Sequence, residues 1–223
     1  MEVLQKITIY DLLGYTVPGS ILVGIMEICF CESGVKTILN AYGKQLGYIC
    51  AVTILLGYVM GMVLAELGKI VFCPINCIVD QQRNKDGHNE AVRIGIDKIK
   101  KALIKSGLDE KQFQVNLNEK ELVKKYSGYM FADLQTDSKY SRIHNYASSE
   151  LVCGNMTLTL LVAGILLYIH KTCWIDVEKG VMYIAAIILL AARYELQRTR
   201  KEDYMVDWFV QKYNGKKHKG GIS

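Results

Sequence analysis

Histidine and cysteine are the residues that most often bind metals or carry nucleophilic chemistry, and their spacing in this chain matches no such site. The four histidines are scattered, at His88, His144, His170 and His218. No Ser-His-Asp order, HExxH helix, phosphate-binding loop or dinucleotide-binding loop accompanies them. Cys73 and Cys77 have a CxxxC spacing, but no histidine lies close enough in the sequence to complete a zinc site. We therefore expect no enzymatic activity, no cofactor and no metal ion.

A second set of polar residues lies inside long apolar runs, where a polar side chain is costly unless it has a partner. Glu27 interrupts one run, and another run holds Asn155, Thr157 and Thr159. These last three residues either line a polar path or bond to neighbouring helices, and the second use is commoner. Glu27 lies near one end of its run. That position favours a hydrated carboxylate at a membrane surface over a buried functional group.

The apolar runs that carry these residues match the thickness of a lipid bilayer. Residues 46–65 are twenty positions without a charge. At about 1.5 Å per residue, a helix of this length spans roughly 30 Å, the thickness of the hydrocarbon core. A second span is predicted at 151–170, where residues 151–169 are also uncharged. Charged residues are dense in the intervening part of the chain, which is typical of a membrane protein with a water-facing part.

Two further spans are predicted from less regular runs. Residues 12–31 are apolar except for Glu27, and Pro18 marks a point where the helix begins or bends. The span 175–194 has a shorter apolar centre, with charged residues near its start and Arg193 at its end. Four spans in two hairpins are therefore expected. Two spans with two helices lying on the membrane surface are the alternative.

Lysine and arginine counts predict the orientation of the chain. Thirteen lie in residues 76–150 and eight in 193–223, whereas the loops 32–45 and 170–179 have two each. Cytoplasmic segments carry the excess of basic residues, so both termini and residues 76–150 are expected in the cytoplasm. Cys29, Cys31 and Cys173 then lie near the outer face. A disulfide from Cys29 or Cys31 to Cys173 fits an oxidising exterior, and free thiols are the alternative.

Small residues recur four apart in the second span and predict a helix that packs closely. Gly57, Gly61 and Ala65 form a smooth groove along one side, and Gly68 follows. Because lipid tails are as apolar as leucine, close backbone approach is what favours association between membrane helices. The groove either joins copies of the chain or packs against another span of the same chain.

Residues 76–150 have the spacing of helices that fold around a core of their own. Residues 89–107 place apolar side chains at helical spacing, and Gly107 follows as a stop. Asn118 and Glu121 fit a helix N-cap and its N3 partner. The helix that they start has one apolar face, made by Leu122, Tyr126 and Met130. Between these helices, residues 113–117 are either a short strand or a loop.

Two more helices are predicted to join this module to the membrane part. One begins at Ser138 and continues into the span 151–170, and the other extends the last span beyond Arg193. The extension has an apolar side, made by Tyr204, Met205, Trp208 and Phe209. Basic residues next to the last span are expected to meet anionic lipid: Arg193, Arg198, Arg200 and Lys201. Nucleic acid is not an expected partner, because residues 76–150 hold eleven acidic residues beside thirteen basic ones.

Three segments, YDLLGYTVPG (10–19), LLGYVMGMVLAELGK (55–69) and ARYELQRTRKEDYMVDWF (192–209), together resemble small four-pass membrane proteins of bacteria that are found near antiphage defence genes. The resemblance implies a homo-oligomeric effector. An infection signal would make such a protein assemble and breach the inner membrane.

The sequence thus predicts an all-α membrane protein with four parts. Residues 1–75 are an N-terminal amphipathic segment and the first hairpin, 76–150 a cytosolic helical module, 151–194 the second hairpin, and 195–223 a cytosolic helix with a basic tail. The expected partners are the lipid bilayer, further copies of the chain, and a cytosolic protein or small signalling ligand bound through 76–150. The alternative function is a non-conducting membrane anchor or sensor that recruits a cytosolic partner.

Overall fold

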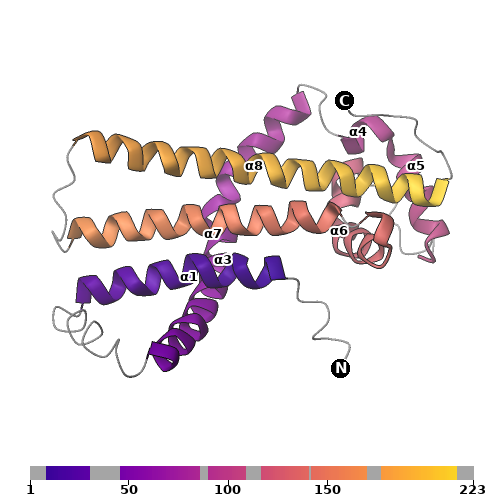
Figure 1. Cartoon of the computed structure of the whole chain (residues 1–223). Helices are drawn as coiled ribbons and strands as arrows, with labels where there is room; N and C mark the ends of the chain where they lie inside the picture. Colours follow the sequence, from indigo (N-terminus) through magenta and orange to yellow (C-terminus); the bar gives the residue numbers. More distant parts are fainter. Residues whose placement is uncertain are drawn as a thin grey trace. The chain divides into compact units, whose positions relative to one another are not determined.

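The computed structural model of the chain describes residues 9–30, 46–85, 90–108, 117–140, 142–169 and 177–214. The regular structure within these ranges is helical (Figure 1), which confirms the all-α fold class. Four helices are long: α1 (Ile9–Phe30), α3 (Leu46–Lys85), α7 (Arg142–Ile169) and α8 (Val177–Asn214). The others are short: α4 (Glu90–Ile94), α5 (Ile96–Lys105), α6 (Glu119–Gln135) and the 3₁₀ turn η3 (Ser138–Tyr140).

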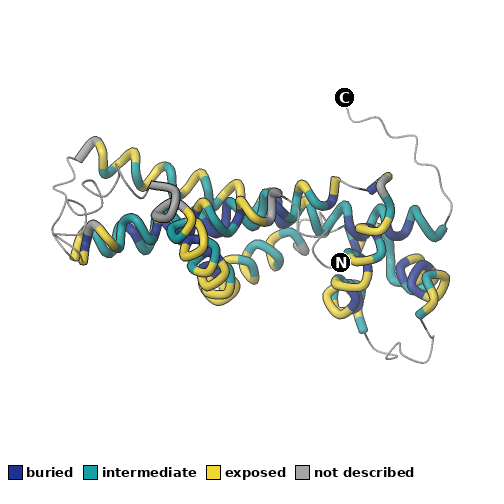
Figure 2. Tube along the Cα trace, turned by 60° about the horizontal axis from the view of Figure 1, so that its bottom comes forward, coloured by how far each residue is buried: buried dark blue, intermediate teal, exposed yellow. Residues whose placement is uncertain are grey.

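Three helical segments among the described residues are long and apolar enough to cross a membrane: Ala51–Arg83, Arg142–Ile169 and Lys179–Asn214. A shorter apolar stretch, Leu12–Glu27, lies within α1. Figure 2 shows many exposed residues along these helices, and several of them are large and apolar, for example Leu55 at 64% and Leu189 at 70% exposed. Apolar surface on this scale is costly in water and favourable against lipid.

The chain divides into two compact units. The apolar unit is Met1–Pro74 with Ser148–Gln197, and the helical module is Ile75–Ala147 with Arg198–Ser223. Helices α3, α7 and α8 each contribute residues to both units.

The apolar unit is held together by close contacts of α1, α3 and α7, with α8 packed on α7. Its buried centre is made by Leu22, Leu64, Phe72 and Leu158. Tyrosines of α8 lie over glycines of α7, Tyr194 over Gly154 and Tyr183 over Gly164. The Tyr183 hydroxyl donates to the Leu160 carbonyl, and the Tyr194 ring stacks on Phe72 with 4.5 Å between centroids.

The helical module has a core of its own, to which α5, α6, α7 and α8 contribute. Eight of its described side chains have no exposed surface: Ile99, Ala102, Leu103, Leu122, Met130, Leu134, Ile143 and Phe209. The predicted apolar face of α6 is confirmed, since Tyr126 is also buried between Leu122 and Met130. The predicted extension of the last span is confirmed as well, because α8 continues without a break to Asn214.

The predicted start of α6 is confirmed, whereas the prediction for the helix before it is wrong. The Asn118 side chain accepts from the Glu121 amide at 3.0 Å, and the Glu121 carboxylate accepts from the Asn118 amide at 3.1 Å. The single helix expected over 89–107 is wrong: Gly95 has a φ of +86° and separates α4 from α5. This conformation is accessible to glycine, and helical periodicity does not reveal it. Of the segment 113–117, residues 113–116 lie outside the described residues.

Candidate functional site

The glycine groove of α3 is occupied by α1 of the same chain. A Cβ atom added to Gly61 would lie 2.0 Å from the Tyr15 carbonyl oxygen, and one added to Gly57 would lie 2.1 Å from the Ser20 hydroxyl. On the α1 side, a Cβ on Gly19 would lie 1.8 Å from the Gly57 carbonyl oxygen. Contacts this short leave no room for a side chain. The two backbones therefore meet directly at these glycines, as small residues allow in membrane helices.

Asn155 lies at the point where α7 meets α1 and α3. Its Nδ2 donates to the Gly14 carbonyl of α1 at 3.0 Å and makes a longer contact of 3.5 Å with the Gly61 carbonyl of α3. Pro18 explains the first bond: proline has no N–H, so the carbonyl four residues earlier, that of Gly14, lacks its helical donor. Without water, an unpaired carbonyl is costly, and the asparagine amide satisfies it.

The two threonines of α7 have different partners. Thr159 Oγ1 donates to the Pro18 carbonyl of α1 at 3.2 Å, one turn along from Asn155. Thr157 Oγ1 donates to the Cys153 carbonyl of its own helix at 2.7 Å. Both side chains are buried, as is Asn155. We call Asn155, Thr159, Gly14 and Pro18 the polar tie, because the first two residues bind the backbone of the other two.

The three polar side chains of the apolar run in α7 form hydrogen bonds within the chain. Of the two alternatives left open, bonding to helices is the one observed for these three side chains. Their hydrogen atoms point to protein carbonyls, so they do not line a polar path in the structure. The arrangement can hold helices together.

Other predicted residues of the apolar unit lie away from the polar tie. Gly68 faces Leu158, whose Cδ1 would lie 3.2 Å from an added Cβ, and Ala65 is half-buried. Glu66 and Lys69, three positions apart on α3, pair with each other at 2.6 Å. Glu27 is exposed and lies on the edge of an apolar pocket between α1 and α3.

A second polar cluster, not foreseen from the sequence, joins α3 to α8 within the helical module. Arg198 is 7% exposed and donates to Asp80 at 2.7 Å and to Glu202 at 3.0 Å. Arg83 binds both carboxylate oxygens of Asp203 at 2.7 Å. The expectation that Arg198 meets lipid headgroups is therefore wrong, because its guanidinium is buried among carboxylates. The i, i+4 spacing of Arg198 and Glu202 was visible in the sequence, but Asp80 is 118 positions away.

The carboxylates of this cluster are partly removed from water. Burial raises the pKa of Glu202 above its usual range, and Arg198 acts in the opposite direction. Burial likewise raises the pKa of Asp203 against the effect of Arg83. Removing one partner of such a pair would leave the other charge partly buried and unpaired, which is costly.

A third polar cluster bonds the end of α8 to α6. Lys212 Nζ lies 2.8 Å from an Asp133 carboxylate oxygen, and the Tyr213 hydroxyl donates to the other oxygen at 2.9 Å. Burial and this bond raise the pKa of Tyr213 to about 12. The Tyr213 carbonyl accepts from Lys105 of α5 at 3.1 Å. The end of α8 is thus bonded to both α5 and α6.

The remaining basic residues of α8 do not share the position of Arg198. Arg193 and Arg200 are exposed, and Lys201 is half-buried. For these three residues, contact with anionic lipid stays a prediction.

The described cysteines form no metal site. Cys73 and Cys77 are exposed free thiols on α3, and Cys29 and Cys153 are buried free thiols. Among the described residues, no group of three or more His, Cys, Asp or Glu side chains could hold a metal ion. Cys31 and Cys173, the other predicted disulfide positions, lie outside the described residues.

Comparison of the chain with protein-family models, with curated proteins and with solved structures finds no match in any of the three.

Proposed function

We propose that the chain is a four-pass protein of the bacterial inner membrane, with both termini and the helical module in the cytoplasm. In this proposal α1 is the first span, although its apolar stretch Leu12–Glu27 is shorter than the other three. The polar tie supports this placement. It satisfies the carbonyl left open by Pro18 inside the apolar unit, which would not be needed for a helix lying in water.

We propose further that the protein is a membrane effector of antiphage defence. The helical module receives a signal or a protein partner, and the membrane helices of several copies then rearrange and perturb the membrane. The observation that carries this function is the continuity of α3, α7 and α8, each of which has residues in both units. A change in the module is thereby coupled to membrane helices through unbroken backbone. The resemblance to defence-associated membrane proteins supplies the biological setting.

Several copies are part of this proposal, because within one copy the polar side chains of α7 bind protein carbonyls and α1 covers the glycine groove. The groove residues Gly57 and Gly61 are covered by α1. Self-association would then use lipid-facing surfaces of α3 or α8, where large apolar side chains are exposed.

Membrane potential and dye leakage in cells that express the chain test the effector function. Depolarisation is expected when the triggering condition is met. As a matched control, Leu103→Asp disrupts the fully buried core of the module without changing the apolar unit, and it should abolish the response while the protein stays in the membrane fraction. An intact potential under every triggering condition would reject the effector function.

A second candidate is a non-conducting anchor that recruits a cytosolic partner. The hydrogen bonds of α7 favour it, since Asn155, Thr157 and Thr159 all bind protein carbonyls. This candidate predicts no leakage and co-purification of a partner through the helical module. Reporter fusions near residue 110 test the orientation shared by both candidates, because both place that residue in the cytoplasm.

A further inference from the structure

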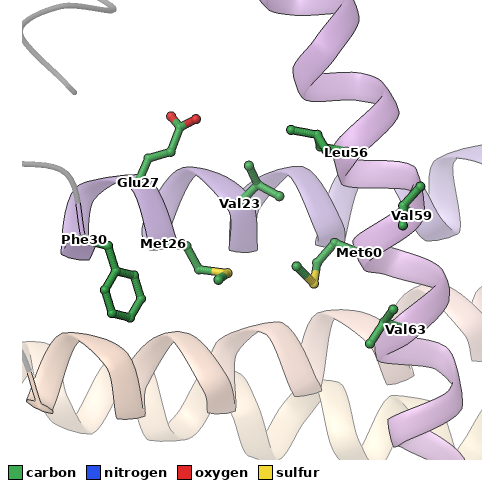
Figure 3. Close-up of a pocket in the computed structure, with 8 residues that line it drawn as sticks. All are labelled: Val23, Met26, Glu27, Phe30, Leu56, Val59, Met60 and Val63. Carbon is green, nitrogen blue, oxygen red and sulfur yellow. The ribbon is translucent and has the colours of Figure 1, made fainter.

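An open apolar pocket lies between α1 and α3 on the side where the two helices diverge (Figure 3). Its volume is about 380 Å³, within the range of about 300–1,000 Å³ that is typical of small-molecule sites. Apolar side chains line it almost completely, including Val23, Met26 and Phe30 of α1 with Val59 and Met60 of α3. We call it the α1–α3 groove.

One charged residue, Glu27, borders this groove. Figure 3 shows it pointing away from Met26 and Phe30, on the same side of α1 as Val23. The side chain is exposed, and within the described part of the chain no cation pairs with it. No charged residue precedes it in α1 back to Leu12. A carboxylate beside membrane apolar surface is stable only with water or a cation at its side.

We propose that the α1–α3 groove binds one acyl chain of a phospholipid whose primary ammonium group pairs with Glu27, a lipid of the phosphatidylethanolamine class. This inference rests on the proposed placement of α1 in the membrane. The groove and the carboxylate offer the two features of such a lipid in one place, a long apolar surface and a negative charge at its edge. The two methionines suit a flexible chain, because thioether side chains adapt to irregular partners.

Charge selects this occupant over two others. An anionic lipid such as phosphatidylglycerol would bring a negative headgroup to the Glu27 carboxylate, and like charges repel. A second copy of the chain that covered the groove would remove Glu27 from water, which is costly for a carboxylate unless the copy supplies a cation. A primary ammonium group donates three hydrogen bonds and neutralises the charge.

The purified full-length chain tests the proposal by native mass spectrometry, which counts protein copies and bound lipids together. Phosphatidylethanolamine and phosphatidylglycerol with identical acyl chains are added in separate titrations. We expect tighter binding of the first, by about two- to fivefold, as for a partly exposed ion pair. Glu27→Gln should remove this preference and leave phosphatidylglycerol binding unchanged. Glu66→Gln, which alters an exposed carboxylate outside the groove, should keep it.

A second variant tests the apolar part of the site. Val59 lines the groove and is 53% exposed, so Val59→Trp fills the space with little effect on the core. It should reduce retention of both lipids. Equal binding of the two lipids, an unchanged preference in Glu27→Gln, or a Val59→Trp variant that loses a protein copy instead of a lipid would each overturn the proposal. These measurements use no leakage assay, so their failure is distinct from failure of the effector function.

Discussion

Asn155 donates a hydrogen bond of 3.0 Å to the carbonyl of Gly14, 141 positions earlier in the chain. Gly14 is the residue whose carbonyl Pro18 leaves without a helical donor. Pro18 and Asn155 therefore have complementary effects on the same carbonyl. The proline creates an open carbonyl in α1, and the asparagine of α7 binds it, so this bond favours the register in which α1 and α7 are packed.

The first prediction concerns this bond. Asn155→Leu leaves the Gly14 carbonyl unpaired and should lower the free energy of unfolding by about 1–2 kcal/mol, the upper part of the range for hydrogen bonds between membrane helices. Unfolding in mixed micelles with increasing denaturing detergent measures it. Thr157→Val is the matched control, because Thr157 bonds only within α7. Its effect should be clearly smaller.

A double-mutant cycle separates this bond from ordinary packing. In Pro18→Ala the new N–H can bond to the Gly14 carbonyl, so loss of Asn155 should cost less in that background than in the native chain. If Asn155→Leu costs the same in both backgrounds, the asparagine does not act through the Gly14 carbonyl.

The second prediction concerns the contact of α1 with α3. A Cβ on Gly19 would lie 1.8 Å from the Gly57 carbonyl oxygen, whereas one on Gly24, five residues later in α1, meets no atom within 4 Å. Gly19→Ala should therefore destabilise the chain by about 1–3 kcal/mol or more through overpacking. Gly24→Ala should be neutral or stabilising by up to about 1 kcal/mol, because alanine favours a helix over glycine.

Size-exclusion chromatography with light scattering completes this comparison. If the glycines serve packing within one chain, Gly61→Ile lowers stability without first changing the number of copies per particle. A stable chain with a smaller assembly would instead assign the groove to contacts between copies.

The third prediction concerns the start of α6. Removing the cap in Asn118→Ala should lower the free energy of unfolding of the chain by about 1 kcal/mol, whereas Asn118→Gly should cost only a few tenths. Thermal unfolding followed by circular dichroism measures both. Ser127→Ala, at a hydroxyl that bonds only to the Lys124 carbonyl in the same helix, is the control and should have little effect. Equal losses for all three would show that the cap contributes nothing specific.

The fourth prediction concerns alkaline pH. Tyr213 has a pKa of about 12 in the folded chain, compared with 10.0 for an unperturbed tyrosine. Between these values the folded state keeps the phenolic proton and the unfolded state releases it, so stability falls as pH rises from about 10 to about 12. Tyr213→Phe should be less stable at neutral pH because it lacks the bond to Asp133, but its melting temperature should fall less over this window. Parallel curves for the two proteins would contradict the prediction.

Interactions within about one helical turn could be predicted from the sequence alone. Uncharged runs such as 46–65 specify helices that prefer lipid, since length and composition suffice for that inference. The capping box of Asn118 and Glu121 and the apolar face through Leu122, Tyr126 and Met130 are also local, and the structure confirms both. In these cases both partners stand within a few positions of each other.

Only the tertiary structure decided which distant groups meet. The sequence showed the Gly57–Gly61 groove and the polar Asn155. It did not show that α1 covers the groove or that Asn155 donates to a carbonyl of α1. Arg198 is buried because Asp80, 118 positions away, lies beside it. Such choices depend on the total packing of several helices, where each backbone group must find a partner and each charge a counter-charge. No local pattern contains that information, because the same helix faces could satisfy themselves in more than one arrangement.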